Sequence, residues 1–143
     1  MMKKNVLLSI CGRQSYPGQE PDSIELVTAG TMEQISGGWE LSYLESDLTG
    51  LDGVKTIFRL EDNKITLTRE GRLRSQMVFM EGMRHESLYQ MEFGALMMVV
   101  CAKKIAHDLT ENGGTVDLVY SIEIEHAMAG TVDYHLDVQV KED

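Results

Sequence analysis

Apolar and polar residues alternate along most of this chain with a period of two, not the 3.6 of an α-helix. Because successive side chains of a strand point to opposite faces, this period predicts strands with one buried face. Residues 131–141 show it most clearly, since Val132, Tyr134, Leu136, Val138 and Val140 alternate with polar residues. The pattern predicts about ten segments, at residues 5–15, 23–35, 39–46, 54–61, 64–70, 76–81, 85–93, 95–102, 116–124 and 131–141.

Short turn signals separate most of these segments. The pairs Gly37-Gly38, Asp62-Asn63, Gly82-Met83, Gly113-Gly114 and Ala129-Gly130 each predict a turn. Neighbouring strands joined by short turns pair antiparallel, and a closed barrel leaves no exposed edge. At 143 residues the chain suits one domain, 1–143. We therefore expect an all-β fold: a single antiparallel meander barrel of about 8–10 strands, with little or no helix.

Two local features leave alternatives open. Gly30 inside the segment 23–35 indicates a bulge or a sharp bend. The apolar run 95–102 fits a buried strand, although helical spacing continues to Leu109. The β-branched Val99-Val100 and the neighbouring strands favour a strand. Whether 95–109 is one long strand, two strands or part helix stays open.

Charge and composition narrow the class of protein. The net charge of -10 argues against binding to nucleic acid or to an anionic membrane. Arg69, Arg72 and Arg74 form a small basic cluster, which we interpret as a solvated turn. No apolar run is long enough to span a membrane, and the run 6–10 is too short for a signal peptide. We expect a cytoplasmic protein whose two cysteines, Cys11 and Cys101, are reduced.

Two opposite charges are predicted to face the barrel interior. Glu45 shares the parity of Leu41 and Tyr43, and Arg69 shares the parity of Leu67. A charge inside a barrel is unfavourable unless it is paired. One interpretation is a structural ion pair that closes one end of the barrel. If that pair is buried, Arg69→Ala should lower stability by about 3–5 kcal/mol.

The other interpretation is a ligand site, in which an apolar wall holds a small amphipathic molecule and Arg69 or Glu45 binds its polar head. Further polar groups share the apolar faces: Gln14, Tyr43, Tyr89, Tyr120 and Tyr134. The 10 methionines could line such a pocket, although they more often fill cores.

Catalytic and metal chemistry find little support in the sequence. Glu45 could act as a general base with Glu81 as a second inward carboxylate. No metal site is expected, because no two of the four histidines lie two residues apart on one strand. No phosphate-binding glycine loop and no nucleophile motif occurs, so we expect no cofactor.

The sequence resembles the YwiB-like family of bacterial proteins of unknown function. The resemblance spans nearly the whole chain, and its most specific part is the stretch from Tyr43 to Leu51. Weaker matches are 24–30, Thr56, 69–71 and 93–94, while Met91 stands where the family pattern has threonine. The resemblance implies a calycin-type, lipocalin-like β-barrel and no established activity.

The leading functional hypothesis is a non-enzymatic barrel that binds a small apolar or amphipathic ligand. Glu45, Arg69, Tyr43, Gln14, Tyr89 and Tyr120 are its candidate ligand-binding residues. The alternative is a filled barrel that binds partner proteins through its acidic surface, and an enzyme with Glu45 as base ranks lowest. A homodimer is left open.

Overall fold

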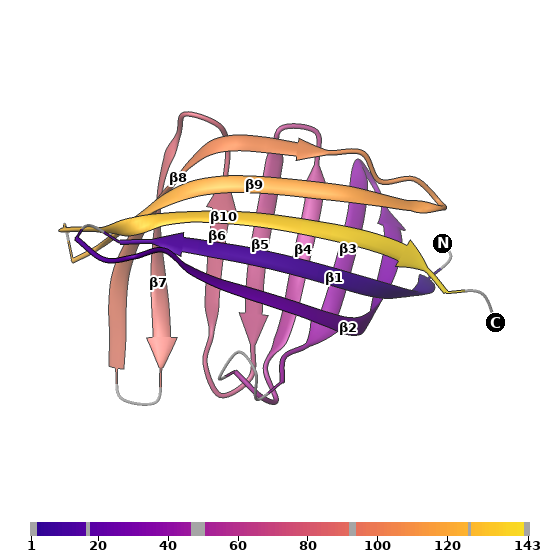
Figure 1. Cartoon of the computed structure of the whole chain (residues 1–143), viewed down its shortest axis with the longest axis horizontal. Coiled ribbons are helices and arrows are strands. Elements are labelled where there is room, and N and C mark those ends of the chain that lie inside the picture. Colours follow the sequence, from indigo (N-terminus) through magenta and orange to yellow (C-terminus); the bar gives the residue numbers. More distant parts are fainter. Residues whose placement is uncertain (1–2, 17, 47–50, 92–93, 126, 142–143) are drawn as a thin grey trace.

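Ten strands make up the structure, which is a computed structural model describing residues 3–16, 18–46, 51–91, 94–125 and 127–141. The described residues contain no helix, and hence none long and apolar enough to cross a membrane. The strands are β1 (Lys3–Ser15), β2 (Asp22–Ile35), β3 (Gly38–Leu44), β4 (Lys55–Glu61), β5 (Lys64–Glu70), β6 (Ser75–Phe79), β7 (Arg84–Met91), β8 (Gly94–His107), β9 (Gly113–Ile124) and β10 (Ala127–Val140) (Figure 1).

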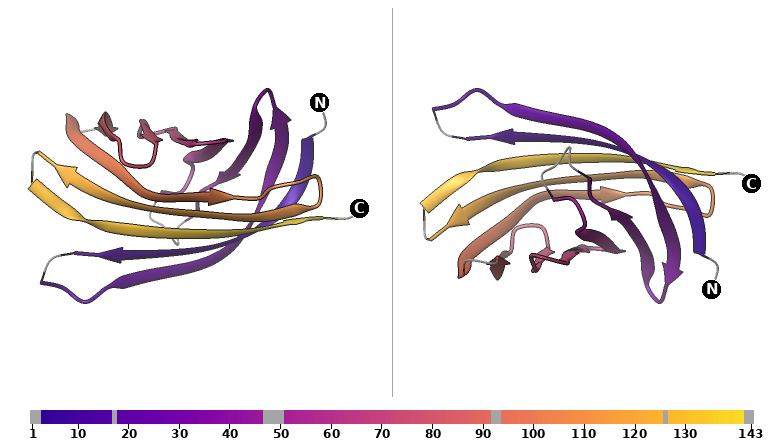
Figure 2. Two further views of the ribbon diagram at one scale, coloured as in Figure 1. Left: turned by 90° about the horizontal axis from the view of Figure 1, so that it is seen from above. Right: turned by 90° about the horizontal axis from the view of Figure 1, so that it is seen from below.

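All ten strands belong to one sheet with the order β6-β5-β4-β3-β2-β1-β10-β9-β8-β7. Every neighbouring pair is antiparallel, and the first and last strands pair with each other in the middle of the sheet. The long strands β1, β2, β8, β9 and β10 form one curved wall, and β3–β6 cross behind it (Figure 1, Figure 2). The predicted all-β meander barrel is confirmed.

The two edge strands, β6 and β7, meet at a seam that nearly closes the barrel. Arg74 and Gln90 form an antiparallel bridge there, with backbone N to O distances of 2.9 and 2.8 Å. A third backbone bond joins Gly82 N–H to the Ala102 carbonyl at 2.9 Å. The seam is therefore held by few bonds compared with the continuous ladders elsewhere.

The strand boundaries correct several local predictions. The turn between β2 and β3 consists of Ser36 and Gly37, and Gly38 already pairs with Ile35, because Gly37 takes the positive φ of 88°. The turn predicted at Ala129-Gly130 is wrong, since both residues lie inside β10 at a register shift. The ambiguous region forms one strand, β8, with a register shift between Ala102 and Lys104.

The bulge considered at Gly30 is absent, because β2 keeps its register there with both β1 and β3. Close approach of the neighbouring strand requires the glycine instead. A Cβ on Gly30 would lie 2.5 Å from the backbone oxygen of Ser42. A side chain at this position would therefore separate β2 from β3.

One end of the barrel interior is filled by large apolar side chains. Leu8, Leu41, Phe58, Leu60 and Phe79 are each no more than 1% exposed and belong to one cluster. Trp39 packs against this cluster and is only half-buried. The other end of the interior, near the start of β10 and the end of β5, carries the polar residues.

Candidate ligand-binding site

A polar row crosses the inner faces of β3 to β6. Tyr43 pairs with Thr56, Thr56 pairs with Arg69, and Arg69 pairs with Ser75. Side chains at paired positions of adjacent strands share one face of a sheet. The row therefore brings a phenol, two hydroxyls and a guanidinium to one level of the barrel.

Glu45 lies next to this row, just beyond the end of β3. Its backbone N–H donates to the Val54 carbonyl at 2.8 Å, which continues the pairing of the two strands past Leu44. The side chain is 7% exposed, so it points inward as the alternation predicts. The Thr56 hydroxyl donates to its Oε2 at 2.5 Å. A carboxylate buried in this way needs such donors to replace lost water.

Sequence reasoning did not assign Thr56 to the site. The alternation of β4 does indicate an inward side chain, because Thr56 is a polar residue on the same face as Phe58 and Leu60. Thr56 is fully buried between β3 and β5. Its role becomes evident only from the register, which sets it beside both Tyr43 and Arg69.

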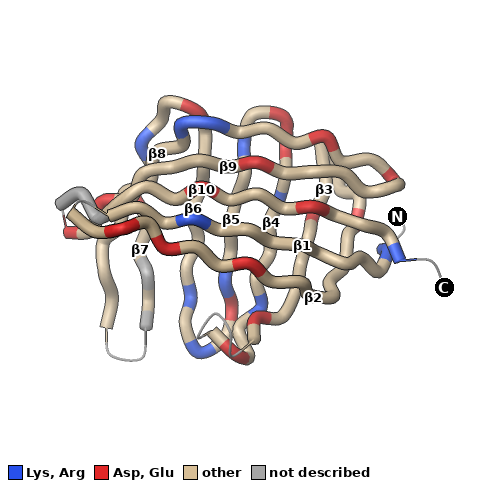
Figure 3. Tube along the Cα trace, viewed as in Figure 1, with Lys and Arg blue, Asp and Glu red and all other residues tan. Residues whose placement is uncertain are grey.

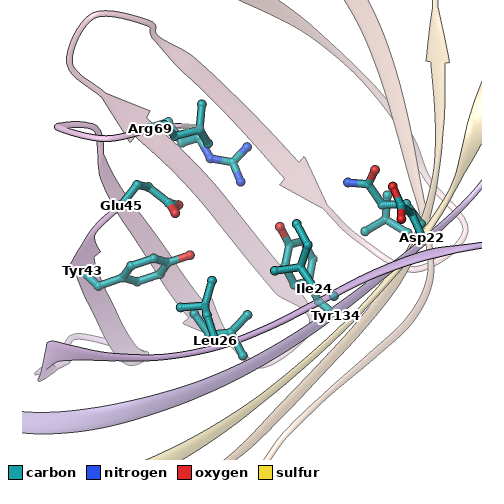
Figure 4. Close-up of a pocket in the computed structure, with 12 residues that line it drawn as sticks. Asp22, Ile24, Leu26, Tyr43, Glu45, Arg69 and Tyr134 are labelled. Atoms are coloured by element: carbon teal, nitrogen blue, oxygen red, sulfur yellow. The ribbon is translucent and has the colours of Figure 1, made fainter. Parts of the chain in front are cut away.

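Arg69 presents its guanidinium to the barrel interior (Figure 4). Its Nε is buried and has no hydrogen-bond partner among the described residues. Burial lowers the pKa of Arg69, but Tyr134, Tyr120 and Glu45 raise it by more, so the side chain is cationic. The site thus holds a positive charge with an unused N–H donor at Nε.

The predicted Glu45–Arg69 ion pair does not form at salt-bridge distance. Among the described residues, no nitrogen of Arg69 lies within 4.0 Å of a carboxylate oxygen of Glu45. The two groups do interact electrostatically at longer range. Figure 4 shows the polar ends of Glu45 and Tyr43 close together, with the Arg69 guanidinium extending into the pocket beside them. The structural interpretation, an ion pair closing the barrel, is therefore wrong in its geometry.

Three tyrosines surround the two charges. The pKa of Tyr43 is raised first by burial and then by the negative charge of Glu45. Burial likewise raises the pKa of Tyr120, whose ring packs 4.4 Å from that of Phe79. Both phenols are therefore neutral hydrogen-bond donors. Tyr134 is half-buried and packs edge-on against Phe58, with ring centroids 6.3 Å apart.

Two partly enclosed cavities adjoin at Arg69. The first chamber has a volume of about 210 Å³, and the residues that define it are Ile24, Leu26, Tyr43, Glu45, Leu51 and Arg69. The second chamber has a volume of about 180 Å³, and the residues that define it are Arg69, Met77, Met98, Tyr120, Ile122 and Ile124. Gln14, Val132 and Tyr134 line both chambers, so the two are neighbours.

Most of the residues predicted from the sequence to bind a ligand line these two chambers. Tyr43, Glu45 and Arg69 line the first chamber, Tyr120 lines the second, and Gln14 lies between them. Gln14 also accepts a hydrogen bond from the Tyr16 hydroxyl at 2.5 Å. The side chain of Tyr89 lies outside the described part of the structure.

Glu81 does not join the site. Its side chain is exposed, and its Oε1 accepts the backbone N–H of Ile105 at 2.9 Å. Glu81 lies beyond the end of β6, where the chain bridges to Ala102 across the seam, so strand parity no longer applies. The predicted pairing of Glu45 with Glu81 for acid–base work is therefore wrong.

Apart from Glu45 and Arg69, no charged residue of the described ranges is buried, although Asp22 lines the first chamber. Figure 3 shows that acidic residues are distributed over several strands and turns. The predicted basic cluster is divided, because Arg72 and Arg74 are exposed whereas Arg69 faces inward. Among the described residues, no three His, Cys, Asp or Glu side chains are placed to hold a metal ion.

Comparisons with known proteins bear on fold and family. The model of a domain of unknown function (DUF1934) matches residues 8–136. The uncharacterized β-barrel protein YwiB of Bacillus subtilis (strain 168) is 30% identical over 115 residues, covering 78% of this chain and 80% of that protein. The crystal structure of ywiB protein from Bacillus subtilis matches with a TM-score of 0.80 and 23% identity, over 94% of this chain and 92% of that chain. The resemblance to the YwiB-like family is confirmed.

Proposed function

The chain belongs to the DUF1934 family, a domain of unknown function, and we propose that its barrel binds a small, partly apolar ligand in the two adjoining chambers. The observation that carries this proposal is the Arg69 guanidinium, which faces a cavity of about 210 Å³ with a buried, unpartnered Nε. A buried N–H donor without a hydrogen-bond partner is unfavourable, so a purely structural barrel gains nothing from it.

The cavities suit a ligand of modest size. Ligand pockets measure roughly 300–1,000 Å³ and combine apolar walls with a few polar groups. Each chamber alone is smaller than that range, at about 210 and about 180 Å³. Leu26 and Ile24 supply apolar wall on one side, and Tyr43 and Arg69 supply polar groups on the other. This division supports an amphipathic molecule.

The competing hypotheses have weaker support. A protein-interaction module should have a filled barrel and a continuous acidic surface. One end of this barrel instead contains a cavity. Its acidic residues are dispersed along the chain (Figure 3). An enzyme that uses Glu45 as its general base should have a second catalytic group close to that carboxylate. Instead the Glu45 carboxylate accepts the Thr56 hydroxyl, and Glu81 is bound to the seam.

An NMR titration of the isotope-labelled protein with the neutral probes benzamide and hexanamide tests the proposal. We expect saturable shifts confined to the residues that line the chambers. Leu26→Trp fills the first chamber and should abolish shifts there. Val27→Trp is the matched control, because Val27 is the next residue of β2 and is 63% exposed. Absence of saturable shifts in the unmodified protein, or identical binding by Leu26→Trp, would contradict the proposal.

A further inference from the structure

The two chambers differ in charge although they share Arg69. Two carboxylates, Asp22 and Glu45, line the first chamber together with Arg69. Among the described residues that line the second chamber, Arg69 alone is charged. An anion in the first chamber would therefore meet two negative charges, whereas in the second it meets only the guanidinium.

The polar groups of the second chamber fit the oxygens of an anion. Arg69 carries five N–H donors in a fixed planar fork, and its Nε is without a partner among the described residues. Tyr120 is 4% exposed, and burial raises its pKa, so its hydroxyl remains protonated and able to donate. Because Arg69 and Tyr120 both line this chamber, a carboxylate bound there has a charged and a neutral donor group in the same lining.

Apolar side chains line part of the second chamber, beside the neutral polar groups of Gln14, Thr131 and Tyr134. Met77, Met98, Ile122 and Ile124 line it, and methionine side chains adapt readily to different apolar shapes. Its volume of about 180 Å³ suits an apolar part of the size of a short chain or a single ring. A dianion such as a phosphate ester would call for a second cation that this lining lacks.

We infer that the second chamber is the anion subsite of the barrel, and that it takes the carboxylate of a small monocarboxylic acid against Arg69 and Tyr120. This inference rests on the proposed function, because it assigns head-group chemistry to a ligand already held inside the barrel. The apolar part of the acid packs on the methionines and isoleucines. Glu45 lies on the first-chamber side of Arg69 and leaves the second chamber without a competing carboxylate.

Matched ligand pairs separate this inference from the proposed function. Benzoate is compared with benzamide, and hexanoate with hexanamide, by calorimetry and NMR titration at pH 7 and fixed ionic strength. We expect each carboxylate to bind at least about tenfold more tightly than its amide, because a charge-assisted bond replaces a neutral one. Arg69→Met and Arg69→Gln should remove the preference, so that acid and amide then bind with equal affinity.

Ile124→Trp should remove carboxylate binding by filling the second chamber, and Val119→Trp on the outer face of β9 is its control. A direct readout needs no variant: the Arg69 Nε–H resonance should shift on addition of benzoate and not of benzamide.

Equal affinity of acid and amide, a preference that survives in Arg69→Met, or tighter binding of inorganic phosphate would each overturn the inference. If the amides also fail to bind, the proposed function falls with it.

Discussion

Thr56 donates its hydroxyl to the buried carboxylate of Glu45 at 2.5 Å, and this bond joins β4 to the chain just beyond β3. Thr56→Val keeps the shape of the side chain but removes the donor. The carboxylate then stays desolvated with one partner fewer, so we expect the free energy of unfolding to fall by about 1.5–3 kcal/mol. Urea denaturation at pH 7 measures this.

Thr56→Ser retains a hydroxyl and should lose less. Thr66→Val is the control, because Thr66 lies on the opposite face of β5 to the buried Ile65 and Leu67. Its change should stay within about 0.5 kcal/mol. Equal effects at both threonines would show that the bond to Glu45 contributes no more than a surface contact.

Replacement of Arg69 by methionine should affect stability little. A closed Glu45–Arg69 ion pair would make the loss about 3–5 kcal/mol. The structure has no such pair within 4.0 Å, and Arg69 Nε is unpartnered. We therefore expect Arg69→Met to change the unfolding free energy by less than about 1 kcal/mol in either direction.

The same urea series on Arg59→Met provides a reference, since Arg59 forms only an exposed ion pair with Glu61 at 3.6 Å. A loss at Arg69 in the range expected for a closed pair would restore the structural interpretation of this residue.

Gly12 should control the shape of the site through Tyr134. The two residues are paired across β1 and β10, and a Cβ on Gly12 would lie 3.3 Å from Cε1 of Tyr134. Gly12→Ala therefore displaces the ring by a few tenths of an ångström and narrows both chambers. We expect benzamide to bind about two- to tenfold more weakly, measured by NMR titration.

Stability should change by less than about 1 kcal/mol, because Tyr134 is only half-buried and its ring can move. Cys11→Ala is the control for the titration: Cys11 is the preceding residue of β1 and is exposed on the outer face. If Gly12→Ala and Cys11→Ala bind the probe equally well, Tyr134 does not shape the binding site.

Alternation and turn chemistry were enough to predict ten antiparallel strands and the inward direction of Glu45. They could not predict the distance between Glu45 and Arg69, because parity assigns a face and leaves the separation between side chains undetermined. Thr56 was missed for a related reason, since its partners follow from the cross-strand register.

Parity failed where regular pairing stops. Glu81 follows the end of β6, and its carboxylate binds a backbone N–H at the seam instead of facing inward. Gly130 looked like a turn residue but lies inside β10, where a register shift accommodates it. The calycin type, the cytoplasmic location, the ligand and the homodimer stay predictions.

His135 should make stability depend on pH. Its Nδ1 lies 2.7 Å from Asp117 Oδ1 and its Nε2 lies 3.4 Å from Asp137 Oδ2. The hydrogen bond to Asp117 raises the pKa of His135 above its ordinary value of 6.5, slight burial opposes this, and the charges of both aspartates add to the rise. The folded state therefore holds the proton more tightly than the unfolded chain.

The sign follows from this difference. The stabilisation is fully present below the unfolded pKa of about 6.5, and it is lost as the pH rises through the higher folded pKa. In Asp117→Asn, the free energy of unfolding should decrease less steeply above about pH 6.5 than in the unmodified protein. Urea denaturation between about pH 5.5 and about pH 8.5 measures this. Asp62→Asn, in the exposed turn between β4 and β5, should leave the profile unchanged.

Because the His135 side chain is 41% exposed, added salt should weaken the effect in the unmodified protein. A pH profile of Asp117→Asn that parallels the unmodified protein would show that Asp117 does not hold the proton on His135.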